Sequence, residues 1–152
     1  GPAGLLFRAL GHLRGASVNL NGAGIDYQYQ GILWHQGERD AQAIDAGNLA
    51  PEEYRTAFED MITRYRSELE DSKSPFHIFQ VGRPLDEDTD GFQKVREIQR
   101  DIAENDPHTE MIFDDCVRFA EDEMMNDRLH YNQTALNEMG RVGAENVVGF
   151  IE

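Results

Sequence analysis

The sequence is poor in several residues that particular functions require. Cys116 is the only cysteine among 152 residues, so neither an intrachain disulfide nor a cysteine-based zinc site can form. Lysine occurs only at Lys73 and Lys94, and 29 acidic against 14 basic residues give a formal net charge of −15. Because binding to phosphates needs a basic patch, we expect neither nucleic acid nor an anionic membrane as a partner. Such a balance is typical of a well-solvated acidic surface or of adaptation to high salt.

Long apolar stretches are also missing. No run of 18 apolar residues occurs, which predicts that the chain has no membrane span. The apolar residues 1–15 are interrupted by arginine and histidine, unlike a signal peptide, and the chain does not begin with methionine. We therefore expect a processed or partial product. The hydrophobic content of 39% predicts a packed globule, and the length suits one domain over residues 1–152.

Hydrophobic periodicity predicts strands that alternate with helices. Helices are expected over 5–13, 51–70, 92–102 and 134–148, and strands over 29–34, 76–81 and 111–113. The segment from Gly15 to the first strand is expected to be mostly loop, 39–50 an excursion above the sheet and 117–125 an irregular acidic loop. The alternation implies parallel βαβ units and an α/β fold. Three strands are few for an independent sheet, so we expect the chain to be part of a larger domain.

The strongest candidate for a site is the segment 31–40, where an apolar strand ends abruptly in polar residues. Ligands of open α/β sheets bind just outside the carboxyl ends of the strands. Gln36 can offer a side-chain N–H donor to a developing oxyanion, typically worth about 3 kcal/mol, or it can cap a neighbouring loop. Glu38 can orient this loop or cap a helix. His35 and Glu38 together are too few ligands for zinc, so we predict no metal site.

A second candidate lies far downstream, where Asp127 and His130 are three residues apart. The carboxylate can then reach the imidazole Nδ1–H, fix its tautomer and stabilise the imidazolium, as the acid of a Ser–His–Asp triad does. Nε2 is left to act as a general base. The alternative is a surface contact within a loop. We expect the two candidate segments to meet in space and form most of a hydrolase active site.

Both segments resemble characteristic blocks of the SGNH hydrolase superfamily. WHQGERDA, residues 34–41, is similar to its W-x-Q-G-E-x-D-A block, and DRLHYNQTALNEMGR, residues 127–141, is similar to its final D-x-x-H-(F/Y) block and helix. The start, GPAGLLFRAL, resembles the helix that follows the nucleophile strand. Within the superfamily, the closest resemblance is to the sialate O-acetylesterase and carbohydrate esterase family six group, which includes acetylxylan esterase-like members.

This resemblance implies a three-layer α/β/α flavodoxin-like sandwich with a parallel sheet, incomplete at its N-terminus and matching the C-terminal part of the family domain. It also implies hydrolysis of O-acetyl groups on carbohydrates without a cofactor. Asp127 and His130 are then the triad acid and base, and Gln36 is the oxyanion-hole donor. Glu38 and His35 support them.

The family's G-x-S-N-type nucleophile block is not found in the chain. Ser17 is the least unsuitable of the four serines, and the nucleophile is otherwise unknown, lying outside the chain or missing from it. The sequence therefore leaves two alternatives to an esterase. One is a non-catalytic glycan-binding module that forms part of a larger surface or viral assembly and so lies outside the cell or on a virion. The other is a purely structural domain or a component of an oligomer.

Overall fold

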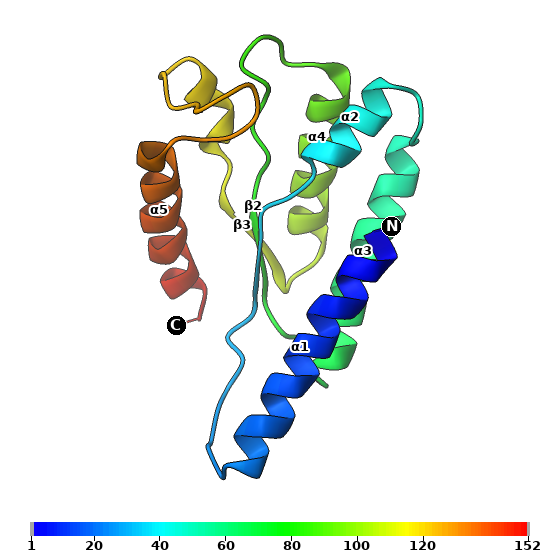
Figure 1. Cartoon of the computed structure of the whole chain (residues 1–152), viewed down its shortest axis with the longest axis vertical. Helices are drawn as coiled ribbons and strands as arrows, with labels where there is room; N and C mark the ends of the chain where they lie inside the picture. Colours follow the sequence, from blue (N-terminus) through cyan, green and yellow to red (C-terminus); the bar gives the residue numbers. More distant parts are fainter. Residues whose placement is uncertain (1, 152) are drawn as a thin grey trace.

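Three parallel strands form the centre of the molecule in the computed structural model, which describes residues 2–151 and the side chains of residues 8–149 (Figure 1). The strand order is β1-β2-β3, and both pairings are parallel. The predicted α/β class is confirmed. The elements are α1 (Pro2–Gly22), β1 (Ile32–Trp34), α2 (Glu38–Asp45), α3 (Pro51–Glu68), β2 (Phe76–Phe79), α4 (Asp90–Asn105), β3 (Thr109–Phe113), the 3-10 helix η1 (Asp115–Ala120) and α5 (Gln133–Ile151).

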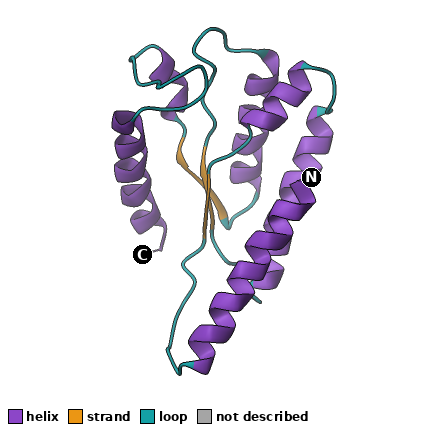
Figure 2. Ribbon diagram, viewed as in Figure 1, coloured by secondary structure: helices purple, strands orange, loops and turns teal. Residues whose placement is uncertain are grey.

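Helices lie on both faces of this sheet and make three layers. Helices α1 to α4 lie on one side and α5 on the other (Figure 2). Alternation along β2 explains the arrangement, because Phe76 and Ile78 are buried in the cluster with α3 and α4, whereas Phe79 lies against Gly143 of α5. The larger apolar core therefore lies under α2, α3 and α4. A smaller one lies between β3, η1 and α5.

Helix α1 is longer than predicted, because it continues through Gly15, where we expected it to end. It closes in a Schellman motif, in which Ile25 N–H bonds the carbonyl of Leu20 at 3.0 Å and Gly24 N–H bonds that of Asn21 at 3.1 Å. Gly24 has a φ of 67°, the left-handed conformation that glycine adopts without cost. The predicted loop is thus confined to the residues between this motif and β1.

Helix α2 replaces the irregular excursion that we predicted for 39–50. It begins at Glu38, with Glu38 and Asp40 in its first turn, where carboxylates are favourable. Ala41 is completely buried, and its backbone oxygen lies against Gly91 of α4. The predicted acidic loop 117–125 likewise contains part of η1, whose Phe119 is fully buried.

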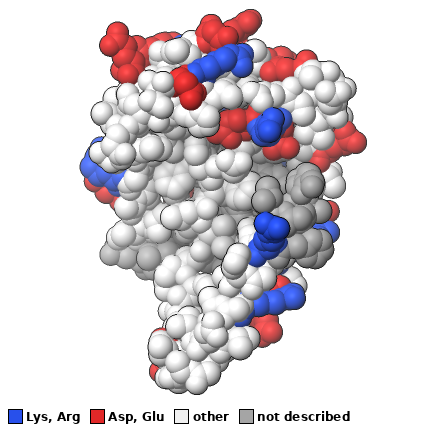
Figure 3. All heavy atoms as spheres, viewed as in Figure 1, with Lys and Arg blue, Asp and Glu red and all other residues white. Residues whose placement is uncertain are grey.

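The surface carries its charge unevenly. Figure 3 shows acidic side chains gathered at the end of the molecule where the loops after β2 and η1 lie, while the lower part of this face, toward the end of α1, is largely uncharged. Among residues 2–151, no helix is both long enough and apolar enough to cross a membrane.

Candidate active site

A glycine turns the chain from β1 into α2 and places Gln36 at the carboxyl edge of the sheet. Gly37 has a φ of 142°, and a Cβ there would lie 2.9 Å from a methyl group of Val95. The Gln99 side chain, buried in α4, donates to the Gln36 carbonyl at 2.9 Å and accepts from Val81 N–H at 3.1 Å. This amide joins the ends of β1 and β2, so the Gln36 backbone is held at the edge where a ligand would bind.

His35 is oriented by a backbone contact at the end of the neighbouring strand. Its Nδ1 lies 3.0 Å from the Phe79 carbonyl, which requires Nδ1 to carry the donated proton. Nε2 then faces Glu38 Oε1 at 3.8 Å. His35 and Glu38 thus lie next to each other on either side of Gln36 and Gly37 in the chain. Within residues 2–151, no three His, Cys, Asp or Glu side chains are grouped so that they could hold a metal ion.

Asp127 and His130 form a hydrogen-bonded pair. Asp127 Oδ2 accepts from His130 Nδ1 at 2.8 Å, and Oδ1 accepts from the backbone N–H groups of Leu129 and His130 at 2.8 and 2.9 Å. These two backbone donors, followed by the imidazole, lower the pKa of Asp127 to about 2. The His130 side chain is 79% exposed, so its Nε2 is open to a reactant. This is the geometry that a carboxylate-oriented general base requires.

Tyr131 brings the two sequence segments together. Its hydroxyl accepts from Gly82 N–H at 2.9 Å at the end of β2, and its ring lies 5.6 Å from that of His35. Burial raises the pKa of this hydroxyl, so it stays neutral. The loop 82–91 is held in turn by Arg96, which donates to the Gly82 carbonyl at 2.6 Å and pairs with Asp88 at 2.6 Å. Gln99 and Arg96 carry no recognisable motif, and sequence reasoning missed both. Tyr131 fills the F/Y position of the D-x-x-H-(F/Y) block, but no role was predicted for it.

The structure does not bring any serine of the chain to His130. Ser17 Oγ lies in α1, 3.1 Å from the Leu13 carbonyl and 2.7 Å from the Tyr29 hydroxyl. Figure 1 places the last turns of α1 at the opposite end of the molecule from the loop that carries His130. Ser67, Ser72 and Ser74 precede β2 and so lie toward the amino ends of the strands. Ser17 therefore lacks the position that a nucleophile would need.

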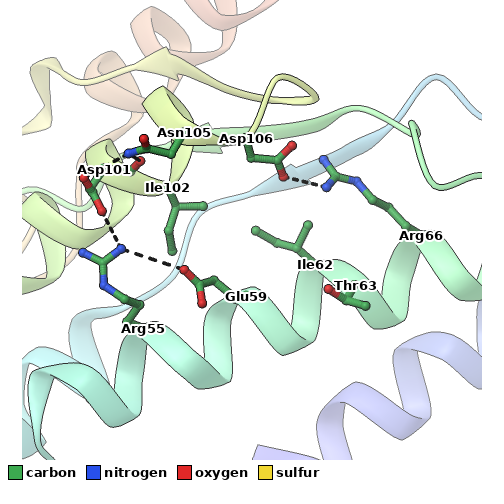
Figure 4. Close-up of a pocket in the computed structure, with 9 residues that line it drawn as sticks. All are labelled: Arg55, Glu59, Ile62, Thr63, Arg66, Asp101, Ile102, Asn105 and Asp106. Atoms are coloured by element: carbon green, nitrogen blue, oxygen red, sulfur yellow. Dashed lines mark hydrogen bonds and ion pairs between the residues drawn. The ribbon is translucent and has the colours of Figure 1, made fainter.

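A cavity of about 560 Å³ lies elsewhere, between α3 and α4 (Figure 4). Arg55 pairs across it with Asp101 at 2.5 Å, and Arg66 pairs with Asp106 at 2.6 Å. The guanidinium groups that line it are thus already matched by carboxylates from the facing side. These pairs join α3 to α4, and the cavity takes no part in the site at the carboxyl edge.

Replacing Tyr131 by phenylalanine is expected to loosen this site. The Gly82 N–H is buried and would lose its acceptor, which costs about 1–3 kcal/mol of unfolding free energy. At about 2–4 °C for each kcal/mol in a chain of this size, the melting temperature should fall by roughly 2–12 °C. Thermal melts followed by circular dichroism measure this. The matched control is Y27F, since Tyr27 is 38% exposed, and an equal shift in both variants would contradict the role of the hydroxyl.

Comparison with known proteins identifies a family for this chain. The model of a family described as carbohydrate esterase, sialic acid-specific acetylesterase, matches residues 12–149 and so covers both candidate segments. No curated protein and no solved structure matches the chain.

Proposed function

Because the chain belongs to the sialic acid-specific acetylesterase family of carbohydrate esterases, we propose that it supplies the acid, the base and an oxyanion donor of a serine O-acetylesterase. The observation that carries this proposal is the Asp127–His130 hydrogen bond of 2.8 Å, on a loop that Tyr131 attaches to the ends of β1 and β2. The substrate class is an acetylated carbohydrate, and the reaction needs no cofactor.

In this mechanism His130 Nε2 takes the proton of a serine hydroxyl as the hydroxyl oxygen attacks the acetyl carbonyl carbon. Asp127 holds the imidazole by Nδ1 and stabilises the cation that forms. Gln36 offers its side-chain N–H to the oxyanion of the tetrahedral intermediate. Collapse of the intermediate returns the proton to the sugar oxygen, and water then releases acetate from the serine in the same way. The serine comes from outside the residues of this chain.

The second candidate is a glycan-binding module that does not turn its ligand over. It is favoured by the position of the serines, none of which lies near His130 in the described structure. The same exposed edge would then hold a sugar without cleaving it.

Acetate release distinguishes the two candidates. The full-length protein is incubated with an O-acetylated sialic acid, free acetate is followed by proton NMR, and binding of the same sugar is measured by its line broadening. An esterase releases acetate continuously. A binding module broadens the sugar signals without releasing acetate, and a protein that does neither contradicts both candidates.

The pH response of Asp127 provides a separate prediction. Its pKa of about 2 in the folded chain lies below the value of about 3.9 for a free side chain. The resulting contribution to stability is complete above about pH 5 and is lost as the pH falls toward 2. Because backbone donors are the largest cause, H130A should leave this pKa well below about 3.9. Carbon-13 NMR titration of the carboxyl group measures it, and a return to the free value in H130A would show that the imidazole is the main cause.

A further inference from the structure

The turn that carries the proposed base also carries an arginine. Arg128 lies between Asp127 and His130, and both backbone bonds to Asp127 Oδ1 close this turn. Two residues span at most about 7 Å, so the Cα atoms of Arg128 and His130 are no further apart than that. The Arg128 carbonyl accepts from Leu85 N–H at 3.0 Å, which fixes the backbone against the loop 82–91.

The guanidinium of Arg128 is only partly occupied. Its Nε lies 3.1 and 3.0 Å from the two carboxylate oxygens of Asp86. Among the residues that the structure describes, no hydrogen bond engages Nη1 or Nη2, and the side chain is 55% exposed. Asp86 therefore orients the guanidinium by one donor and leaves the terminal N–H groups free for another acceptor. An exposed pair of this kind is weak and can be shared with a ligand.

The charge around the site makes this cation unusual. The loops 82–91 and 121–132 are rich in acids, and their two basic residues are Arg83 and Arg128. Arg83 is turned toward Glu121 at 3.3 Å, and its side chain is only 15% exposed. A ligand with a negative charge would be repelled by a chain of net charge −15 unless a local cation received it. Arg128 is the exposed cation of these loops.

We propose that Arg128 binds the carboxylate of an acidic sugar and so makes the site prefer sialic acids over neutral acetylated sugars. This inference rests on the proposed function, because it takes the sugar to be bound beside His130. Sialic acids carry a carboxylate, and the terminal N–H groups of arginine match both oxygens of that group. The acetyl group would then be presented to His130 while the acid end is held by Arg128.

Two glycosides that lack O-acetyl groups test the assignment without turnover. They are the methyl glycoside of N-acetylneuraminic acid and the same compound with its carboxylate converted to a methyl ester. Dissociation constants are measured by NMR titration for the wild type, R128Q and R128K. The matched control is R141Q, because Arg141 is similarly exposed and paired with Glu145 at 3.0 Å on α5. Circular dichroism confirms that each variant folds.

The acid should bind the wild type and R141Q alike, and R128Q at least about tenfold more weakly, as expected for loss of a charge-assisted contact. R128K should recover part of the binding, because lysine keeps the positive charge but lacks the paired terminal N–H donors of the guanidinium. The methyl ester should bind all variants equally weakly. No binding of the acid by the wild type, or equal binding by R128Q, overturns the assignment. Failure of the proposed function is seen separately, as hydrolysis of 4-nitrophenyl acetate that does not change in H130A.

Discussion

Replacing His130 by alanine is expected to reduce ester hydrolysis by about 10⁴-fold or more, the scale of losses on removing the base of a triad. In the proposed mechanism the imidazole takes the serine proton, since Asp127 has a pKa of about 2 and is a poor base at neutral pH. Hydrolysis of 4-nitrophenyl acetate by the full-length protein measures the effect as kcat/KM.

The loss should be catalytic rather than structural. His130 is 79% exposed, so its truncation removes little packing, and the melting temperature should stay within about 2 °C of the wild type. H12A is the matched control, because His12 is an exposed histidine of α1 and should leave kcat/KM unchanged. D127N should lower kcat/KM in the same direction. If H130A and H12A hydrolyse the ester equally well, Asp127 and His130 are not a catalytic pair.

Strong periodicity made the fold class predictable. The apolar face of α3 and the β-branched and aromatic composition of β2 are local signals of a helix and a strand. Both elements were therefore predicted close to their observed bounds. Helix α2 was missed because its buried residue, Ala41, is small and gives almost no hydrophobic signal. The predicted helix was too short because Gly15 was taken as its end. A glycine inside a helix costs only about 1 kcal/mol, which is too little to end α1 there.

The contacts of the candidate site were predictable only where both partners lie in one short segment. The spacing of Asp127 and His130 is enough to specify their hydrogen bond, because both partners lie in one turn. Gln99 and Tyr131 act across the fold, joining strand ends that are distant in sequence. Even where such a residue stands in a motif, as Tyr131 does, the sequence does not show which backbone group tens of residues away its side chain will bond, so these contacts become visible only in the structure.

Replacing Gly91 by alanine should have the largest effect on stability. Gly91 is the second residue of α4, and a Cβ there would overlap the backbone oxygen of Ala41 in α2 and lie 2.8 Å from Asp45 Oδ1. Gly91 N–H also donates to that carboxylate at 2.7 Å. A backbone oxygen cannot turn aside as a side chain can, so α2 and α4 must separate. Overpacking and loss of the Asp45 contact together should cost about 2–5 kcal/mol.

Urea unfolding measures this cost, and G140A provides the control. Gly140 lies in α5, and a Cβ added there would meet nothing within 4 Å, so alanine should be neutral or stabilising by up to about 1 kcal/mol through its helix propensity. Because α2 begins two residues after Gln36, G91A should also displace this proposed oxyanion donor and lower kcat/KM more than G140A does. Equal unfolding free energies for the two variants would mean that α2 does not pack on α4 through this glycine.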